Sequence, residues 1–279
     1  MIFELEKDDY EKVQSIYKPL EFNLITRAVI EGSSPGRIYV DDIICPKTAF
    51  MCTVEGYYLA GNENNDVFNT ALNKLIVERI FAGDTVRKGE KDISLCISPN
   101  TWELKLDIVF KGRSPFKVVR RHYICTRKIF AWENRVPDGF SVHPIDERFL
   151  KRRDLEIHDH IIDWMMSNWV TTDHFLQNGF GFCTLHGRKT ISWCIADCIS
   201  GRACEVGIRT ISGYRRRGLG TLTVAATVDY CLSHGFTVIG WHCDEDNLGS
   251  VRVAEKAGFE RERDYIFYIC MFDDVDVIQ

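Results

Sequence analysis

The chain has 279 residues, 45% of them apolar, and a net charge of −5, which suits a globular protein of one large or two smaller domains. The negative charge argues against a general nucleic-acid binder, and no apolar run reaches the length of a membrane span. The acidic first residues predict that there is no signal peptide. Eleven scattered cysteines without a paired C-x-x-C motif predict reduced, mostly buried thiols in a cytoplasmic protein.

In the N-terminal half, hydrophobic spacing predicts elements but no catalytic cluster. We predict helices over 8–17, 21–31 and 67–81, and strands over 37–41, 49–54, 93–97 and 117–125. The pair Asp41-Asp42 is interpreted as an exposed turn rather than a carboxylate site. The segment NRVPDGF (134–140) groups proline, aspartate and glycine, which is typical of a turn or linker. We therefore predict a smaller α+β domain of unclear role over 1–135 and a second domain over 136–279.

The C-terminal half has clearer patterns. We predict strands over 140–143, 180–185, 190–198, 203–210, 236–243 and 265–271, and helices over 155–169, 219–233 and 247–257. The strand over 236–243 is continuously apolar, as expected when both faces of a strand are buried. Antiparallel strands followed by a βαβαβ order predict an α/β domain with a mixed β-sheet flanked by helices.

The segment GYRRRGLG (213–220) joins a predicted strand to a predicted helix. Helix N-termini leave backbone N–H groups unpaired and carry partial positive charge, so a glycine-containing entry makes a phosphate cradle. Gly218 and Gly220 allow close approach of a ligand, and Arg215, Arg216 and Arg217 add charged donors. Gly213 and Gly218 have the spacing of a nucleotide-triphosphate loop, but Leu219-Gly220 replaces its Lys-Ser/Thr pair, and GxGxxG is also absent.

What fits is Arg-x-x-Gly-x-Gly after a strand, at Arg215, Gly218 and Gly220. This spacing resembles the acyl-CoA signature of the GNAT superfamily of N-acetyltransferases. The segment NLGSVRVAEKAGF (247–259) is similar to the asparagine-started helix that follows in that family. A narrower resemblance, carried by GFGFCTL, YRRRGLG and WHCDEDNLGSVRVAEKAGF, is to the branch with the zwittermicin-resistance acetyltransferases, which also has an extra N-terminal domain.

The resemblance implies acetyl-CoA as co-substrate. No metal is expected, because His158, His160 and His174 have no carboxylate at ligand spacing. Main-chain groups of Ile208 and Thr210 would pair with the pantetheine arm, and Asn247 and Ser250 would lie beside pantetheine and sulfur. The pyrophosphate would bind backbone N–H groups of a run that comprises Arg217, Gly218, Leu219, Gly220 and Thr221.

The resemblance leaves the proton-transfer groups open. Glu205 is the candidate base, with a surface strand residue as the alternative, and His242 is a second candidate, with a packed or solvent-facing histidine as the alternative. Ala254 stands where many relatives carry a tyrosine that protonates the thiolate, so the acid would be water or Ser250. Candidates for acceptor recognition share a position on the early helices of the domain: His158, His160, Trp164, Trp169, Asp173 and His174.

Three functions follow from these expectations. The first is an N-acetyltransferase that moves an acetyl group from acetyl-CoA to a small-molecule amine. The alternatives are a protein N-acetyltransferase and a non-catalytic acyl-CoA-binding sensor or interaction module. Nucleic acid and membranes are not expected as partners, and a homodimer is left open.

Overall fold

The computed structural model describes residues 1–83, 86, 92–128 and 131–271, and these form two compact units. Unit 1 comprises Met1–Val119 and the segment from Tyr265 onward, whereas unit 2 comprises Arg120–Asp264. The domain boundary predicted after residue 135 therefore lies inside unit 2. The Pro137–Gly139 segment is a turn, as predicted, but the turn leads into a strand of that unit, where the Phe140 N–H donates to the Pro137 carbonyl at 3.1 Å.

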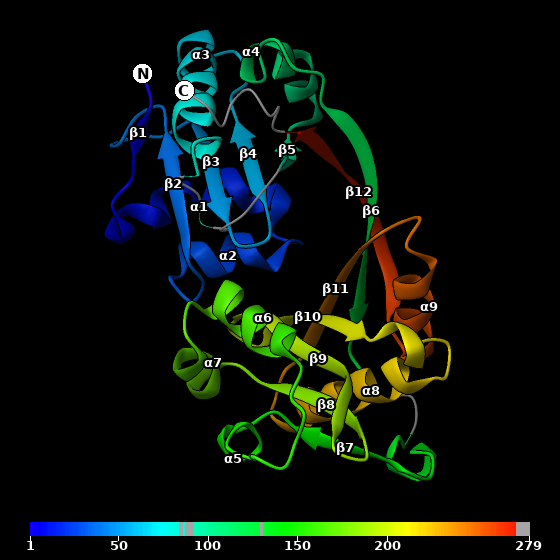
Figure 1. Cartoon of the computed structure of the whole chain (residues 1–279). Helices are drawn as coiled ribbons and strands as arrows, with labels where there is room; N and C mark the ends of the chain where they lie inside the picture. Colours follow the sequence, from blue (N-terminus) through cyan, green and yellow to red (C-terminus); the bar gives the residue numbers. More distant parts are fainter. Residues whose placement is uncertain (84–85, 87–91, 129–130, 272–279) are drawn as a thin grey trace. The chain divides into compact units, whose positions relative to one another are not determined.

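Unit 1 is a mixed sheet with helices (Figure 1). Its strands lie in the order β1-β2-β3-β4-β5-β12, with bounds Phe3–Glu4, Gly36–Val40, Thr48–Thr53, Tyr57–Gly61, Asp92–Ser98 and Glu260–Met271. Its α-helices are α1 Gln14–Tyr17, α2 Leu24–Ile30, α3 Asp66–Leu75, which continues as a π-helical turn over Ile76–Ile80, and α4 Leu106–Val109. Shorter 3₁₀ segments cover Lys7–Val13, Lys18–Leu20 and Asn100–Lys105.

Unit 2 has a sheet of the same kind. Its strands lie in the order β6-β11-β10-β9-β8-β7, with bounds Phe116–Cys125, Val238–Asp244, Ala203–Thr210, Lys189–Ser200, Gly181–His186 and Phe140–Pro144. Its helices are α5 Glu147–Leu150, α6 Asp159–Trp169, α7 Thr172–Asn178, α8 Leu219–Ser233 and α9 Leu248–Lys256, with 3₁₀ turns at Glu133–Arg135 and Ser212–Tyr214. The predicted α/β class, a mixed sheet flanked by helices, is confirmed.

The two units repeat one topology. In unit 1 the strands β2, β3 and β4 pair antiparallel, α3 follows, and β5 runs parallel to β4. In unit 2 the strands β8, β9 and β10 pair antiparallel, α8 follows, and β11 runs parallel to β10. Each unit takes its next strand from the other half of the sequence, because β12 pairs with β5 and β6 pairs with β11. The chain therefore passes between the units inside strands, where no proline or glycine marks the boundary.

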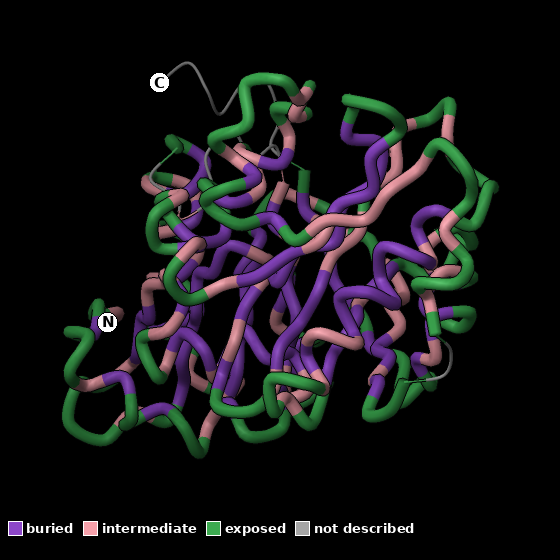
Figure 2. The backbone as a smooth tube through the Cα atoms, turned by 90° about the horizontal axis from the view of Figure 1, so that it is seen from below, coloured by how far each residue is buried: buried purple, intermediate pink, exposed green. Residues whose placement is uncertain are grey.

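Each unit has its own hydrophobic core, and Figure 2 shows buried backbone in the interior with exposed loops around it. The core of unit 1 includes Phe50 and Trp102, and that of unit 2 includes Trp193 and Trp241. Helix α8 is apolar around most of its circumference and correspondingly buried. It ends at Ser233, and Gly235, whose φ of +87° suits glycine, follows its C-cap His234. All eleven cysteines are free thiols, and all but Cys45 are buried, as predicted. Within the described residues, no helix has the length and apolarity needed to cross a membrane.

Candidate active site

The predicted phosphate loop joins β10 to α8 in unit 2 and has an unusual backbone. Arg216 and Gly218 have positive φ angles of +61° and +80°, whereas Arg215 between them and β10 is extended. Residues with positive φ next to residues with negative φ turn successive backbone N–H groups toward one side, and these groups together form an anion-binding concavity. Gly218 is the N-cap of α8 and supplies no capping side chain, so the first turn keeps its N–H groups for a ligand.

Two of the three arginines of this loop contact the protein itself. Arg215 Nε donates to the Thr210 carbonyl at 3.0 Å, and the Arg217 guanidinium lies 5.1 Å from the ring centre of Phe140. Arg216 is exposed. The arginine side chains therefore add positive charge around the loop, while the backbone at Gly218–Thr221 provides the organised donors.

Strands β10 and β11 separate beside this loop. Their parallel pairing covers Ala203–Glu205 against Val238–Gly240 in the described structure, although β10 continues to Thr210 along β9. From Trp241 onward β11 remains paired with β6. Among the described residues, the backbone edge of Ile208 and the N–H of Thr210 are thus open toward the gap, whereas the Thr210 carbonyl accepts from Arg215 Nε.

Helix α9 begins shortly after β11 ends, at the end of the sheet where β10 and β11 separate. Asn247 caps the helix by accepting the Ser250 N–H at 3.1 Å, and Ser250 Oγ accepts the indole N–H of Trp241 at 3.1 Å. The predicted residues Asn247 and Ser250 therefore come together. Ala254 is completely buried in the core of unit 2, so this helix presents no titratable group at that position.

Glu205 and His242 meet at the point where β10 and β11 separate. His242 Nε2 lies 2.9 Å from Glu205 Oε1, and only 3% of Glu205 is exposed. The alternative of a surface strand residue at Glu205 is therefore wrong. The contact requires Gly240, because a Cβ at that position would lie 2.8 Å from Glu205 Cγ.

Two further residues, His122 on β6 and Glu262 on β12, extend this pair. The His122 ring stacks on that of His242 with centroids 4.4 Å apart, and His122 Nδ1 lies 2.6 Å from Glu262 Oε2. Burial, helped by the nearby charge of His242, lowers the pKa of His122 to about 4, so this imidazole is neutral at pH 7. Sequence reasoning missed both residues, and the one available signal was a histidine within a predicted strand.

Three of these residues also form a group that could hold a metal ion. Ligand atoms of His122, Glu205 and His242 lie within 4.8 Å of one another. The two imidazole planes, however, differ by only 11°. Nitrogen lone pairs lie in the ring plane, so those of stacked rings run side by side rather than converge on one ion. The arrangement suits hydrogen-bonded proton transfer better than chelation.

The six residues predicted for acceptor recognition separate into two groups. Trp164 and His160 on α6 reach toward β9 and β10, where Trp164 Nε1 donates to Asp197 and His160 Nε2 lies 2.9 Å from Arg209 Nη1. The other four serve packing or helix starts: His158 caps α6, the Trp169 indole donates to the Ala196 carbonyl, His174 packs on Trp169, and Asp173 lies in the first turn of α7.

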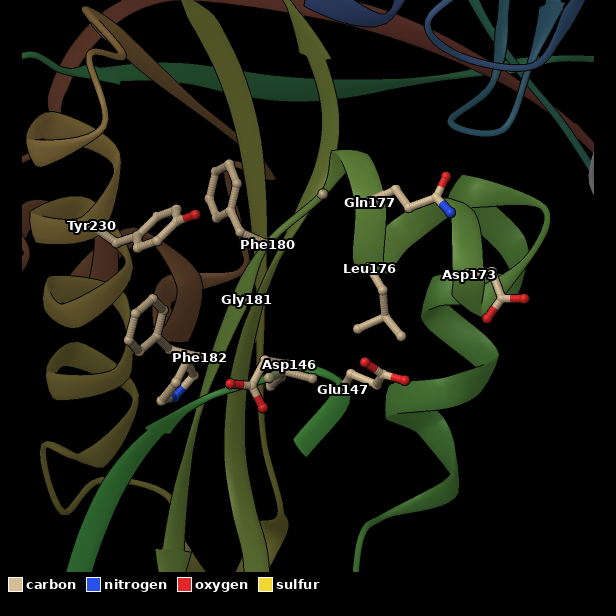
Figure 3. A pocket seen from close by; sticks show the side chains of 12 residues that line it. Asp146, Glu147, Asp173, Leu176, Gln177, Phe180, Gly181, Phe182 and Tyr230 are labelled. Carbon is tan, nitrogen blue, oxygen red and sulfur yellow. The ribbon is translucent and has the colours of Figure 1, made fainter. Parts of the chain in front are cut away.

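A cavity of about 570 Å³ lies elsewhere in unit 2, between β8, α7 and α8 (Figure 3). Phe180, Phe182 and Tyr230 line one side, while carboxylates face it from the other. Asp146 caps α5 by accepting the Phe149 N–H at 2.7 Å, and Glu147 forms an ion pair with Lys151. These carboxylates already have helix-capping and ion-pair partners, so we do not assign a site to this cavity.

Comparisons with known proteins agree with this geometry. A family model described as GNAT acetyltransferase matches residues 14–268. The chain is similar to the uncharacterized N-acetyltransferase YdfB of Bacillus subtilis, with 26% identity over 95% of this chain and 97% of that protein. Its fold is similar to a GCN5-related N-acetyltransferase-like protein from Streptococcus suis (TM-score 0.68, 21% identity, 94% and 98% of the two chains). It is also similar to a tandem GNAT protein from the clavulanic acid biosynthesis pathway (TM-score 0.58, 10% identity, 98% of both chains).

Proposed function

Since the chain belongs to the GNAT acetyltransferase family, we propose that it transfers an acetyl group from acetyl-CoA to the amine of a small molecule. The observation that carries the proposal is the uncapped N-terminus of α8 beside the open edge of β10. The loop would hold the pyrophosphate, and Ile208 and Thr210 would direct the pantetheine arm toward Glu205. A cytoplasmic location belongs to the proposal and is supported by the free thiols.

Glu205 with His242 would take the proton that the attacking amine loses. The amine nitrogen attacks the thioester carbonyl, a C–N bond forms, the C–S bond breaks, and CoA leaves as a thiolate that takes up a proton. An ordinary alkylamine has a pKa near 10.4 and is mostly protonated at pH 7, so a base must remove a proton before attack. Ser250, which the Trp241 indole holds in place, or water would supply the proton to sulfur.

One observation favours a second candidate, a non-catalytic acyl-CoA sensor. Ala254 is buried at the position where related enzymes often carry a tyrosine that acts as the general acid. The phosphate loop by itself accounts only for binding of the cofactor. Turnover of acetyl-CoA against polyamines, aminoglycosides and N-terminal peptides tests the proposal. Acetylation of a small amine supports it, acetylation of peptides alone favours the protein acetyltransferase, and tight binding without turnover favours the sensor. Membership of the zwittermicin-resistance branch stays a prediction.

Acetyl-CoA should bind once per chain, although the topology occurs twice. In unit 1 the helix that corresponds to α8 is α3, whose N-terminus is closed by the Asn65 side chain, which accepts the Phe68 N–H at 3.1 Å. Asp66 adds negative charge in the first turn, which disfavours a pyrophosphate. Calorimetric titration should give one site, and ligand at 100 times its Kd should add about 2.7 kcal/mol to the free energy of unfolding. Two equivalent sites, or no binding to folded protein, would contradict this expectation.

A further inference from the structure

Asp197 on β9 occupies an irregular position next to the separating strands. Glu205 of β10 pairs with Cys198, whereas the next residue, Val206, pairs with Ala196. Asp197 is therefore the extra residue of a β-bulge, and bulges commonly redirect a side chain beside a functional site.

Helix α6 holds the Asp197 carboxylate by one oxygen only. Trp164 Nε1 and Asn168 Nδ2 both donate to Oδ1, at 2.7 and 2.9 Å. Oδ2 has no hydrogen-bond partner among the described residues. Among the described residues no lysine or arginine pairs with Asp197, and Arg209 Nη1 of β10 lies 2.9 Å from His160 Nε2. Figure 1 shows α6 crossing beside β9 and β10, the strands that carry Asp197 and Glu205.

The unpartnered oxygen lies directly over β10. A Cβ on Gly207 would overlap the Trp164 ring and lie 2.8 Å from Asp197 Oδ2, so glycine is needed here for the carboxylate to reach the strand. Gly207 and Glu205 are two residues apart and hence on the same face of β10, with about 7 Å between their Cα atoms. The two carboxylates consequently flank one stretch of β10, next to the open edge at Ile208.

The surroundings of Asp197 favour a positively charged ligand. Burial, with a further contribution from the charge of Glu205, raises the pKa of Asp197 to about 7. A bound cation would offset both the desolvation of the Asp197 carboxylate and its repulsion from Glu205, because a cation interacts favourably with both negative charges.

From this placement we infer that Asp197 binds a second, non-reacting ammonium group of the acceptor, which makes the acceptor a diamine or polyamine. The inference rests on the proposed function. The nitrogen that is acetylated must lose its proton near Glu205 and cannot hold a lasting charge. The Asp197 carboxylate, whose free oxygen lies over the same face of β10, instead pairs with a second nitrogen that stays protonated.

Direct binding of amines tests this inference. Diamines of three to eight carbons and spermidine are compared with butylamine by calorimetry, at constant ionic strength, with and without saturating CoA. The wild-type protein should bind at least one diamine about tenfold more tightly than butylamine. Asp197→Asn should remove that preference and leave butylamine unchanged. Asparagine keeps an oxygen that accepts from Trp164 and Asn168, so an unchanged melting temperature will verify the fold.

Asp163→Asn is the matched control, because Asp163 is an exposed carboxylate on α6, the helix whose Trp164 and Asn168 hold Asp197. This variant should keep the diamine preference. The inference is overturned by equal binding of mono- and diamines, by an unchanged preference in Asp197→Asn, or by equal losses in both variants. Failure of the proposed function is distinct: the chain would then transfer no acetyl group to any amine, whether or not acetyl-CoA binds and whatever its preference among amines.

Discussion

Gly220→Asp should weaken binding of CoA about a thousandfold, whereas Arg216→Ala should weaken it only severalfold. Gly220 is buried in the first turn of α8, where its N–H faces the predicted pyrophosphate position. Two like charges about 4 Å apart near a protein surface repel by about 4 kcal/mol, which is about three powers of ten in Kd. Arg216 is exposed and has charged neighbours on both sides, so its loss removes little. Calorimetric titration with CoA measures both.

Two variants separate the causes of this effect. Gly220→Ala adds only a Cβ, which would lie 3.0 Å from Thr210 Oγ1, and reports the contribution of bulk. Gly213→Asp adds the same charge to the same loop at a position with no neighbour within 4 Å of a Cβ, and should have a smaller effect than Gly220→Asp. Equal changes of Kd in Gly220→Asp and Arg216→Ala would show that side-chain charge, not backbone approach, dominates the loop.

The cofactor-binding part of the site could be predicted from the sequence, because the residues that define it follow one another closely along the chain. Strand β10 and helix α8 have the predicted bounds, 203–210 and 219–233. A glycine-rich entry, an apolar helix and a terminal glycine follow one another within a short stretch, and each acts through the backbone of its own segment. Strand β4 and the helices α5 and α7 were missed because they have only 5, 4 and 7 residues, too few to show a clear hydrophobic period.

The catalytic side depends on pairings between distant parts of the chain. Glu205 and His242 were both candidates, but their contact follows from the parallel register of Glu205 with Gly240. His122 and Glu262 are 140 residues apart in sequence. They meet because β6, from the first half of the chain, pairs with β11, and β12, from the end of the chain, pairs with β5. No local sequence pattern predicts such an exchange of strands.

The same exchange explains why the predicted boundary differs from that of the structure. Proline and glycine punctuate turns, and the turn at Pro137–Gly139 exists. The chain leaves unit 1 between Val119 and Arg120, in the middle of β6, where the residues continue as an ordinary strand. Asp197 was overlooked for a related reason: a bulge appears only when two strands are aligned, and the strand itself was predicted without its register.

Glu205→Gln should lower kcat by at least about tenfold and leave the Kd of acetyl-CoA nearly unchanged. General base catalysis typically raises the rate 10²- to 10⁴-fold, so even a partial contribution of Glu205 would lower kcat by more than about tenfold when it is lost. Glutamine has the same shape and keeps an oxygen for the hydrogen bond with His242, so the fold should persist. The cofactor loop follows the opposite end of β10, which is why affinity for acetyl-CoA should not change.

A matched control and a pH profile make this test specific to proton transfer. Glu260→Gln removes an exposed carboxylate paired with Arg127 in the same unit and should leave kcat unchanged. The acid limb of the pH–rate profile should change in Glu205→Gln alone, because a purely structural role would lower the rate at every pH alike. If Glu205→Gln retains most of the wild-type kcat on a confirmed acceptor, the base is elsewhere. His242 would then be the next candidate, or the enzyme captures the small neutral fraction of its amine without a base.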